Sequence, residues 1–332
     1  MTPLGTSDGD SVAKRRHFRD NMAIRHQQVT PGAYSGFMLE TLHPTWHRRA
    51  VMMAMASLAI MPSTPIDAHA RTDIDPFGLG VASGDPSGDG FVLWTRLIGR
   101  GLAPLDAKAV SVRYEVAADR GFRTIVRRGV LPARPEAAHS VHVEVGGLPS
   151  GRAFWYRFHA LGATSPIGRT TTVPQTSARL RIAVTSCQHW EQARFGAYRD
   201  MIAQQPDLVL QLGDYIYEQT YPDQAKVRSF GTSEPLDLGG YRQRHALYKT
   251  DPDLQAAHRA CPWVVTWDDH EVLNDYANLA NRTGEPAAMF ATRRAAAYQA
   301  YFEHMPIRPS IWHGASTVSY THLRAHETSL HL

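Results

Sequence analysis

Three short apolar runs decide the fold: RIAVTSC (181–187), DLVLQLGD (207–214) and PWVVTWDDH (262–270). Each has the length and composition of a buried strand. Residues 193–205, between the first two runs, fit a helix, and a longer polar, helical stretch separates the second run from the third. Strands that alternate with helices predict a parallel α/β sheet, in which functional sites lie at the carboxyl ends of the strands.

Reactive side chains lie at the ends of all three runs or directly after them. They are Cys187 and His189 after the first, Asp214, Tyr217 and Glu218 after the second, and Asp268, Asp269, His270, Glu271 and Asn274 after the third. The ends of parallel strands share one edge, and buried carboxylates brought together there repel unless a cation lies between them. The sequence therefore predicts a site for one or two multivalent metal ions. Thiolate and phenolate favour a ferric ion, whereas carboxylate and amide oxygens suit a harder divalent ion.

Each of these residues also has a simpler interpretation. A buried cysteine such as Cys187 is commonly a small core residue, or it pairs with the second cysteine, Cys261, as a disulfide. Asp214 is a candidate helix cap, His270 a candidate structural histidine, and Tyr217 a candidate core aromatic. None of these interpretations explains why three consecutive strand ends all carry reactive groups, so the metal site is favoured.

The region before these runs, residues 76–173, follows a different pattern. It contains FVLWTRL (91–97), VSVRYEVA (110–117), SVHVEVGGL (140–148) and AFWYRFHAL (153–161), which alternate or run apolar between Gly and Pro. Short strands at such spacing predict an antiparallel β-sandwich. The segment GLPSG (147–151), followed by Tyr156, is similar to the tyrosine corner of fibronectin-type domains. The predicted fold is a fibronectin-like β-sandwich (76–173), a short linker from Pro174, and an α/β sheet (180–314).

The first 70 residues carry the features of an export signal. Arg48 and Arg49 precede an apolar stretch, AVMMAMASLAIM (50–61), and the small-residue site Ala-His-Ala (68–70) follows. A basic pair, an apolar stretch and a cleavage site form a secretory leader, and paired arginines are typical of the twin-arginine export machinery. The mature protein would then begin near Arg71, in the periplasm or outside the cell. The alternative is a short buried helix with incidental arginines.

Composition excludes several classes of protein. The 332 residues include 35 Lys and Arg against 31 Asp and Glu, a formal charge of +4, which is too balanced for a dedicated nucleic-acid-binding module. Two cysteines exclude a disulfide scaffold and a zinc site of the CxxC type. Since no apolar run reaches about 20 residues, the sequence predicts no membrane span.

Three strings carry a family resemblance: VTSCQ (184–188), QLGDYIYE (211–218) and WDDHEVLNDYA (267–277). In this order they resemble successive blocks of the PhoD-type alkaline phosphatases, which are part of the calcineurin-like metallophosphoesterase superfamily. FGLGVASGDPSGDGFVLWTRL (77–97) is similar to the opening of the N-terminal β domain of that family. The resemblance covers residues 76–314, and it implies an exported, metal-dependent phosphoric ester hydrolase that acts on phosphate monoesters or diesters.

The resemblance also implies roles for individual residues. Cys187, Asp214 and Tyr217 would bind Fe³⁺. Asp214 would bridge to a Ca²⁺ site that also uses Asp269 and Asn274. His270 would be the catalytic residue that contacts the phosphoryl group, with a metal-activated water attacking phosphorus.

The chain departs from the family after about residue 314. Members of the family continue further and supply more metal ligands from a later Gly-Asp-x-His block, whereas the last residues here, VSYTHLRAHETSLHL (318–332), have no helix or strand period and are predicted to be a non-native tail. We therefore expect an incomplete phosphoesterase domain, with an unpaired sheet edge, an uncovered apolar face and little activity. The alternative function is a non-catalytic extracellular binding module whose phosphoesterase half is degenerate or truncated.

Overall fold

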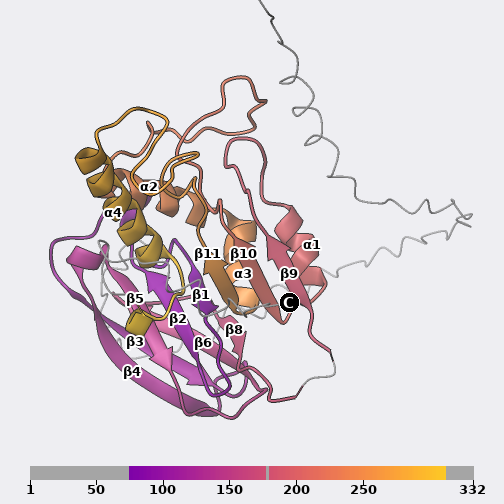
Figure 1. Cartoon of the computed structure of the whole chain (residues 1–332). Coiled ribbons are helices and arrows are strands. Elements are labelled where there is room, and N and C mark those ends of the chain that lie inside the picture. Colours follow the sequence, from indigo (N-terminus) through magenta and orange to yellow (C-terminus); the bar gives the residue numbers. More distant parts are fainter. Residues whose placement is uncertain (1–74, 177–178, 312–332) are drawn as a thin grey trace, which may run out of the picture. The chain divides into compact units, whose positions relative to one another are not determined.

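The computed structural model describes residues 75–176 and 179–311, which all belong to one compact unit (Figure 1). Its larger sheet has six strands in the order β5-β2-β1-β11-β10-β9. The bounds are β1 Val81–Gly84, β2 Phe91–Arg96, β5 Ser140–Val145, β9 Ile182–Thr185, β10 Leu208–Leu212 and β11 Trp263–Thr266. Strands β5, β2 and β1 are antiparallel, and β11, β10 and β9 are parallel. The predicted α/β class is confirmed.

The second sheet is antiparallel, in the order β4-β3-β6-β7, with β8 also paired to β6. Its strands are β3 Val110–Ala117, β4 Ile125–Ala133, β6 Ala153–Ala160, β7 Ala163–Thr164 and β8 Gly168–Thr171. The two sheets share one core, in which Phe91 and Val143 of the first sheet are clustered with Val116, Phe154 and Phe158 of the second. Strands β6 and β8 alternate buried and partly buried residues, because one face of each lies in the core, whereas β2 is buried along its whole length.

The division into sheets differs from the expectation of a β-sandwich followed by a separate α/β sheet. Strand β1 pairs with β2 on one side and, through Gly84 and Trp263, with β11 on the other. A Cβ atom at Gly84 would lie 2.8 Å from the carbonyl oxygen of Trp263, so glycine permits this close approach. The β-rich region and the α/β region therefore share one continuous sheet. The fibronectin-like topology of the first region remains a prediction.

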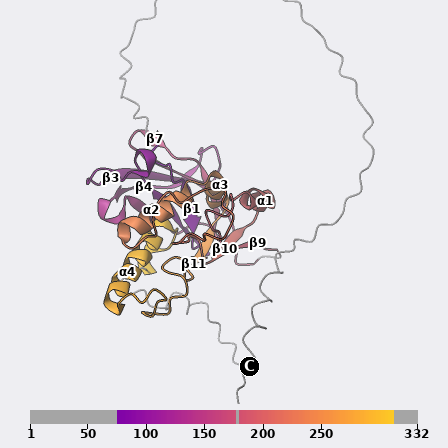
Figure 2. The same cartoon turned by 90° about the horizontal axis from the view of Figure 1, so that it is seen from above.

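Residues 75–176 and 179–311 contain four α-helices: α1 Ala197–Ala203, α2 Leu238–Lys249, α3 Pro252–Ala260 and α4 Ala287–His304. Three short 3-10 helices span Arg100–Leu102, Pro135–Ala137 and Pro309–Ile311. Helices α2 and α4 lie side by side, as do α1 and α3 (Figures 1 and 2). Helix α3 begins at Asp251, whose carboxylate accepts hydrogen bonds from the N–H groups of Asp253 and Leu254 and so caps the helix.

Helices α1 and α3 cover one face of the parallel strands. Tyr198 of α1 and Leu254 of α3 belong to the same buried cluster as Val209 and Trp263. On the opposite face, Ile182, Val184 and Leu212 are 47%, 61% and 53% exposed within the described part of the chain. Parallel sheets are normally covered on both faces, so this exposed apolar surface is unusual.

Two sequence predictions fall outside the described residues: the leader (1–70) and the non-native tail (318–332). Among the helices that the structure does describe, none combines the length and the apolar composition needed to cross a membrane.

Candidate metal centre

The turns after β9 and β10 carry Cys187 and Asp214 in unusual backbone conformations. Their φ angles are 56° and 53°, in the left-handed region that few non-glycine residues adopt and that is common at functional sites. Gly213 has a φ of 101°, and a Cβ atom there would lie 2.4 Å from the Cβ of Asp268. The glycine therefore lets the ends of β10 and β11 approach each other, which brings their acidic residues together.

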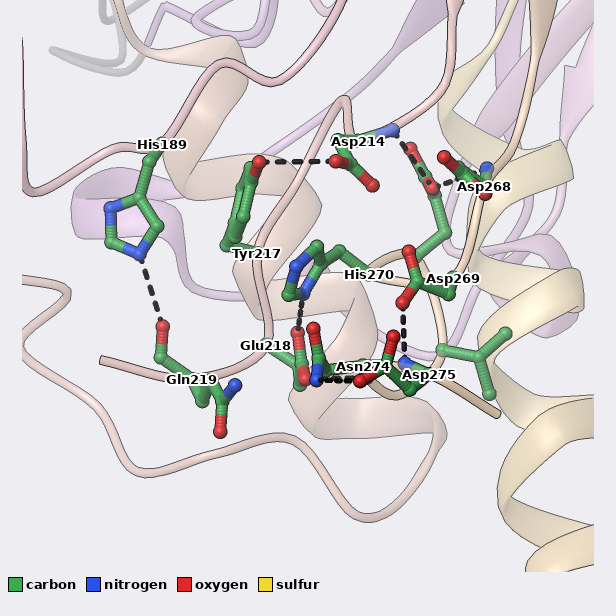
Figure 3. A network of polar contacts seen from close by, with 12 residues as sticks. His189, Asp214, Tyr217, Glu218, Gln219, Asp268, Asp269, His270, Asn274 and Asp275 are labelled. Carbon is green, nitrogen blue, oxygen red and sulfur yellow. Dashed lines mark hydrogen bonds and ion pairs between the residues drawn. The ribbon is translucent and has the colours of Figure 1, made fainter. Parts of the chain in front are cut away.

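Asp214, Asp269 and His270 form a compact cluster at this edge of the sheet (Figure 3). Each offers one potential ligand atom, and these atoms lie within 4.8 Å of one another. The Oδ2 atom of Asp214 accepts a hydrogen bond from the Tyr217 hydroxyl at 3.1 Å. Its Oδ1 atom is buried and has no hydrogen-bond partner among the described residues. A buried carboxylate oxygen without a partner is costly, so the arrangement fits a bound cation.

The Cys187 thiol lies against this cluster from the β9 side. Its backbone N–H donates to the Gly213 carbonyl at 3.3 Å. Cys187 is exposed rather than buried as a core residue would be, but partial desolvation and the neighbouring charge of Asp214 raise its pKa. Burial, Asp214 and Cys187 likewise raise the pKa of Tyr217. Thiolate, phenolate and carboxylate cannot all be charged here without a cation to compensate them, so this donor set fits a multivalent metal ion.

The predicted disulfide alternative is excluded. Cys187 and Cys261 are both free. Cys261 is fully buried in the core beside Trp263, and burial raises its pKa to about 12. Cys261 is thus a structural core residue, and Cys187 is the thiol that accompanies the acidic cluster.

Glu218 holds His270 in a defined orientation. The fully buried carboxylate of Glu218 accepts a hydrogen bond from Nδ1 of His270 at 2.7 Å. The Nε2 atom of His270 lies 3.2 Å from the Tyr221 hydroxyl, and the imidazole ring lies 4.1 Å from the Tyr217 ring centroid. Burial opposes protonation of His270, but the hydrogen bond and charge of Glu218, with the nearby aspartates, raise its pKa.

Asn274 lies on the Glu218 side of the cluster (Figure 3). Its backbone N–H donates to Glu218 Oε1 at 2.8 Å, and its side-chain amide donates to Asp275 at 3.1 Å. Its side chain is thus directed to Asp275, whereas Asp214, Asp269 and His270 place their potential ligand atoms within 4.8 Å of one another. A role for Asn274 as a ligand remains a prediction.

Glu218 and Glu271 stand in the sequence strings that predicted the site, but neither had a predicted role. Glu271 is fully buried, and its carboxylate accepts the N–H groups of Asp214 (3.1 Å), Tyr215 (2.5 Å) and Asp268 (2.8 Å). It therefore joins the turns after β10 and β11. Both acids stand inside the strings GDYIYE and WDDHE, which was the available signal. Tyr221 had no comparable signal, since it follows in a polar loop.

Comparison with known proteins agrees with this geometry. The family model for the N-terminal domain of PhoD-like phosphatases matches residues 62–174, and the PhoD-like phosphatase model matches residues 182–327. Alkaline phosphatase D of Bacillus subtilis (strain 168) is 47% identical over 257 residues, which are 74% of this chain and 44% of that protein. A solved structure of PhoD is also 47% identical, with a TM-score of 0.70 over 73% of this chain and 48% of that chain.

The chain spans less than half the length of each of these two relatives. The region matched by the two family models includes the β-rich region and the ends of β9, β10 and β11, which carry the reactive side chains. The resemblance predicted from three sequence strings is confirmed. The chain belongs to the PhoD-like phosphatase family.

Proposed function

We propose that this chain carries the catalytic site of a metal-dependent hydrolase of phosphate esters. The observation that carries the proposal is the buried, unpartnered Oδ1 atom of Asp214, within 4.8 Å of ligand atoms on Asp269 and His270. The similarity to alkaline phosphatase D supports the same reaction class. Phosphate monoesters and diesters are both candidate substrates.

The residues suit two different ions. Cys187, Asp214 and Tyr217 would hold a ferric ion, because thiolate and phenolate stabilise an acidic metal. Asp214, Asp269 and Asn274 offer oxygen donors of the kind that Ca²⁺ prefers. Such ions, when bound, polarise the phosphoryl oxygens and acidify a water for attack on phosphorus. The raised pKa values of Cys187 and Tyr217 mean that both groups release protons when they bind metal.

His270 has the geometry of a proton donor. Since the Glu218 carboxylate only accepts hydrogen bonds, Nδ1 of His270 carries a proton directed at Glu218. The raised pKa of the ring favours a second proton, on Nε2. That proton can stabilise charge on the phosphoryl oxygens or be transferred to the departing alkoxide. The Tyr221 hydroxyl beside Nε2 keeps this nitrogen hydrogen-bonded before substrate arrives.

We also propose that the protein is exported in its folded, metal-loaded form through the twin-arginine machinery. The support is the pair Arg48 and Arg49 before the apolar stretch 50–61. Replacement of both arginines by lysine should retain the precursor in the cytoplasm, and the exported protein should begin near Arg71. Exported protein that still contains residues 52 and 53 would contradict this.

Metal binding and turnover test the main proposal. The purified chain, reconstituted with iron and calcium, should retain metal after dialysis, and any hydrolysis of a chromogenic phosphomonoester or phosphodiester should be chelator-sensitive. Asp214→Asn should lose both metal and turnover. Asp223→Asn is the matched control, because Asp223 is exposed and its substitution removes the same charge. Failure of the unaltered chain to bind either metal would refute the site.

The second candidate is a non-catalytic binding module. Stoichiometric metal binding without turnover on either ester would support this candidate, and turnover by this chain would exclude it.

A further inference from the structure

A cavity lies at the end of the parallel strands opposite the metal centre. Its volume is about 760 Å³. Arg181 and Asp207, which line it, directly precede β9 and β10, whereas Cys187 and Asp214 follow the same strands. Other walls come from β6, β8, the turn between β3 and β4, and the ends of α1 and α3. The cavity therefore lies between the antiparallel sheet and the helices of the α/β region, at the opposite end of the parallel strands from the acidic cluster.

The lining of this cavity is strongly basic. Four arginines line it: Arg120, Arg169, Arg181 and Arg259. The single lining carboxylate, Asp207, accepts a hydrogen bond from the backbone N–H of Arg181 at 2.8 Å. Elsewhere in the chain, arginines such as Arg228 and Arg242 pair with carboxylates. Within residues 75–176 and 179–311, none of the four guanidinium groups in the cavity has such a partner.

Helix capping accounts for only part of this charge. Arg181 donates to the carbonyl of Gln204 at the end of α1, at 2.7 Å. Arg259 stands in the last turn of α3, where a cation is favourable. Arg120, in the turn between β3 and β4, and Arg169, on β8, stabilise no helix end. Like charges gathered around one cavity repel, and a bound anion would relieve that repulsion.

The cavity also presents an indole ring. Trp155 of β6 pairs in register with Arg169 of β8, and both are half-buried lining residues. No aromatic ring or cation from the described part of the chain stacks on Trp155. An indole ring is a suitable platform for a planar base, and guanidinium groups bind phosphates in a bidentate fashion.

We propose that this cavity binds a nucleoside diphosphate or triphosphate, with the base against Trp155 and the phosphate chain against Arg120, Arg169 and Arg259. The volume lies within the range of small-molecule sites. Because the cavity is at the opposite end of the strands, binding there does not require the metal centre. The ligand is therefore distinct from the ester hydrolysed at Asp214.

Calorimetric titration of the full chain, with excess chelator to disable the metal centre, tests the proposal. ATP should bind most tightly, tripolyphosphate more weakly and adenosine weakest. Arg120→Gln with Arg259→Gln changes two exposed side chains, so the fold should be retained. This double variant should weaken ATP binding by about tenfold for each lost arginine–phosphate contact. Trp155→Leu should weaken ATP but leave tripolyphosphate unchanged.

Arg134→Gln with Arg152→Gln is the matched control, because both arginines are exposed and neither lines the cavity. It removes the same charge and should leave ATP affinity within about twofold of the parent chain. The proposal is overturned by absence of ATP binding, or by equal losses in the control and the test variant. Equal affinity for ATP and tripolyphosphate, with no effect of Trp155→Leu, would overturn the nucleotide assignment in favour of an inorganic oligophosphate.

Discussion

The carboxylate of Glu271 connects the two turns that carry Asp214 and Asp269. It is fully buried and accepts three backbone N–H groups, from Asp214, Tyr215 and Asp268. A glutamine in its place keeps the shape but replaces one acceptor oxygen by a donor NH₂. At least one of these N–H groups then faces a donor. The distance between Asp214 and Asp269 therefore depends on Glu271, although Glu271 itself need not contact a metal ion.

We predict that Glu271→Gln lowers the free energy of unfolding by about 1–3 kcal/mol and weakens metal binding by about 10- to 100-fold. Denaturant unfolding of the metal-free chain and titration with iron measure the two effects separately. Glu136→Gln is the control, because Glu136 is an exposed glutamate outside the site. Parental metal affinity in Glu271→Gln would show that the turns hold their positions without it.

His270 and Glu218 form a pair whose charge state can be measured directly. Burial opposes protonation of His270, but the hydrogen bond and charge of Glu218, together with the charges of Asp214 and Asp269, raise its pKa. We predict that Glu218→Gln lowers the pKa of His270, so that in the metal-free chain the ring loses its proton at lower pH. Nuclear magnetic resonance titration of isotope-labelled histidine measures this change. An unchanged His270 titration would mean that Asp214 and Asp269 dominate its electrostatics.

Strand β8 depends on a glycine for its contact with β6. Gly168 is paired in register with Tyr156, and a Cβ atom at Gly168 would lie 2.2 Å from the Tyr156 ring. The ring is fully buried in the core between the sheets, so it has little room to move aside.

We predict that Gly168→Ala costs about 1–3 kcal/mol of stability through overpacking. Gly88→Ala is the matched control, because no atom lies within 4 Å of the Cβ position there, and its effect should stay within about 0.5 kcal/mol. Urea unfolding of both variants provides the measurement. Equal stability of the two variants would mean that Tyr156 adjusts at no cost.

At the scale of the molecule, the open face of the parallel strands is an association hazard. Ile182, Val184 and Leu212 expose about half of their side-chain surface, and a contiguous apolar patch promotes aggregation. We predict that Val184→Thr with Leu212→Gln reduces binding of a hydrophobic dye and slows aggregation. Val130→Thr is the control, since Val130 is 63% exposed on the other sheet. The same gain in solubility from Val130→Thr would show that this face has no special role.

Buried histidines make the stability of the whole molecule depend on pH. Burial lowers the pKa of His245, His258 and His304, and it lowers that of His142 to about 4. Histidine in an unfolded chain has a pKa near 6.5. Below that pH the unfolded state takes up protons that the folded state does not, so stability is present above about pH 6.5 and is lost as the pH falls.

We predict that the free energy of unfolding falls steadily from pH 7 to pH 5, by up to about 1.4 kcal/mol per pH unit for each such histidine. Urea unfolding at several pH values measures the slope. His142→Gln should reduce the slope by the contribution of one titrating histidine, because glutamine does not titrate. A slope that is unchanged in this variant would mean that His142 titrates normally in the folded protein.

The sequence alone determined the features that depend on local pattern. Strands β2, β3 and β6 lie within the predicted runs, because alternating or continuous apolar residues mark a strand that is buried on one or both faces. The reactive groups Cys187 and Asp214 could be found because parallel strands share an edge, so their end residues must converge. Strand β4 was missed, since most of its residues remain at least partly exposed and no alternation marks it.

Tertiary structure alone decided the features that depend on distant segments. The pairing of β1 with β11 joins residues far apart in the chain, and no local period records it. The orientation of His270 by Glu218, and the direction of the Asn274 side chain toward Asp275, follow from how two turns pack together. Hydrogen bonds of this kind require positions within about 3 Å. A sequence pattern specifies which face a residue occupies, whereas such distances arise only when the chain has folded.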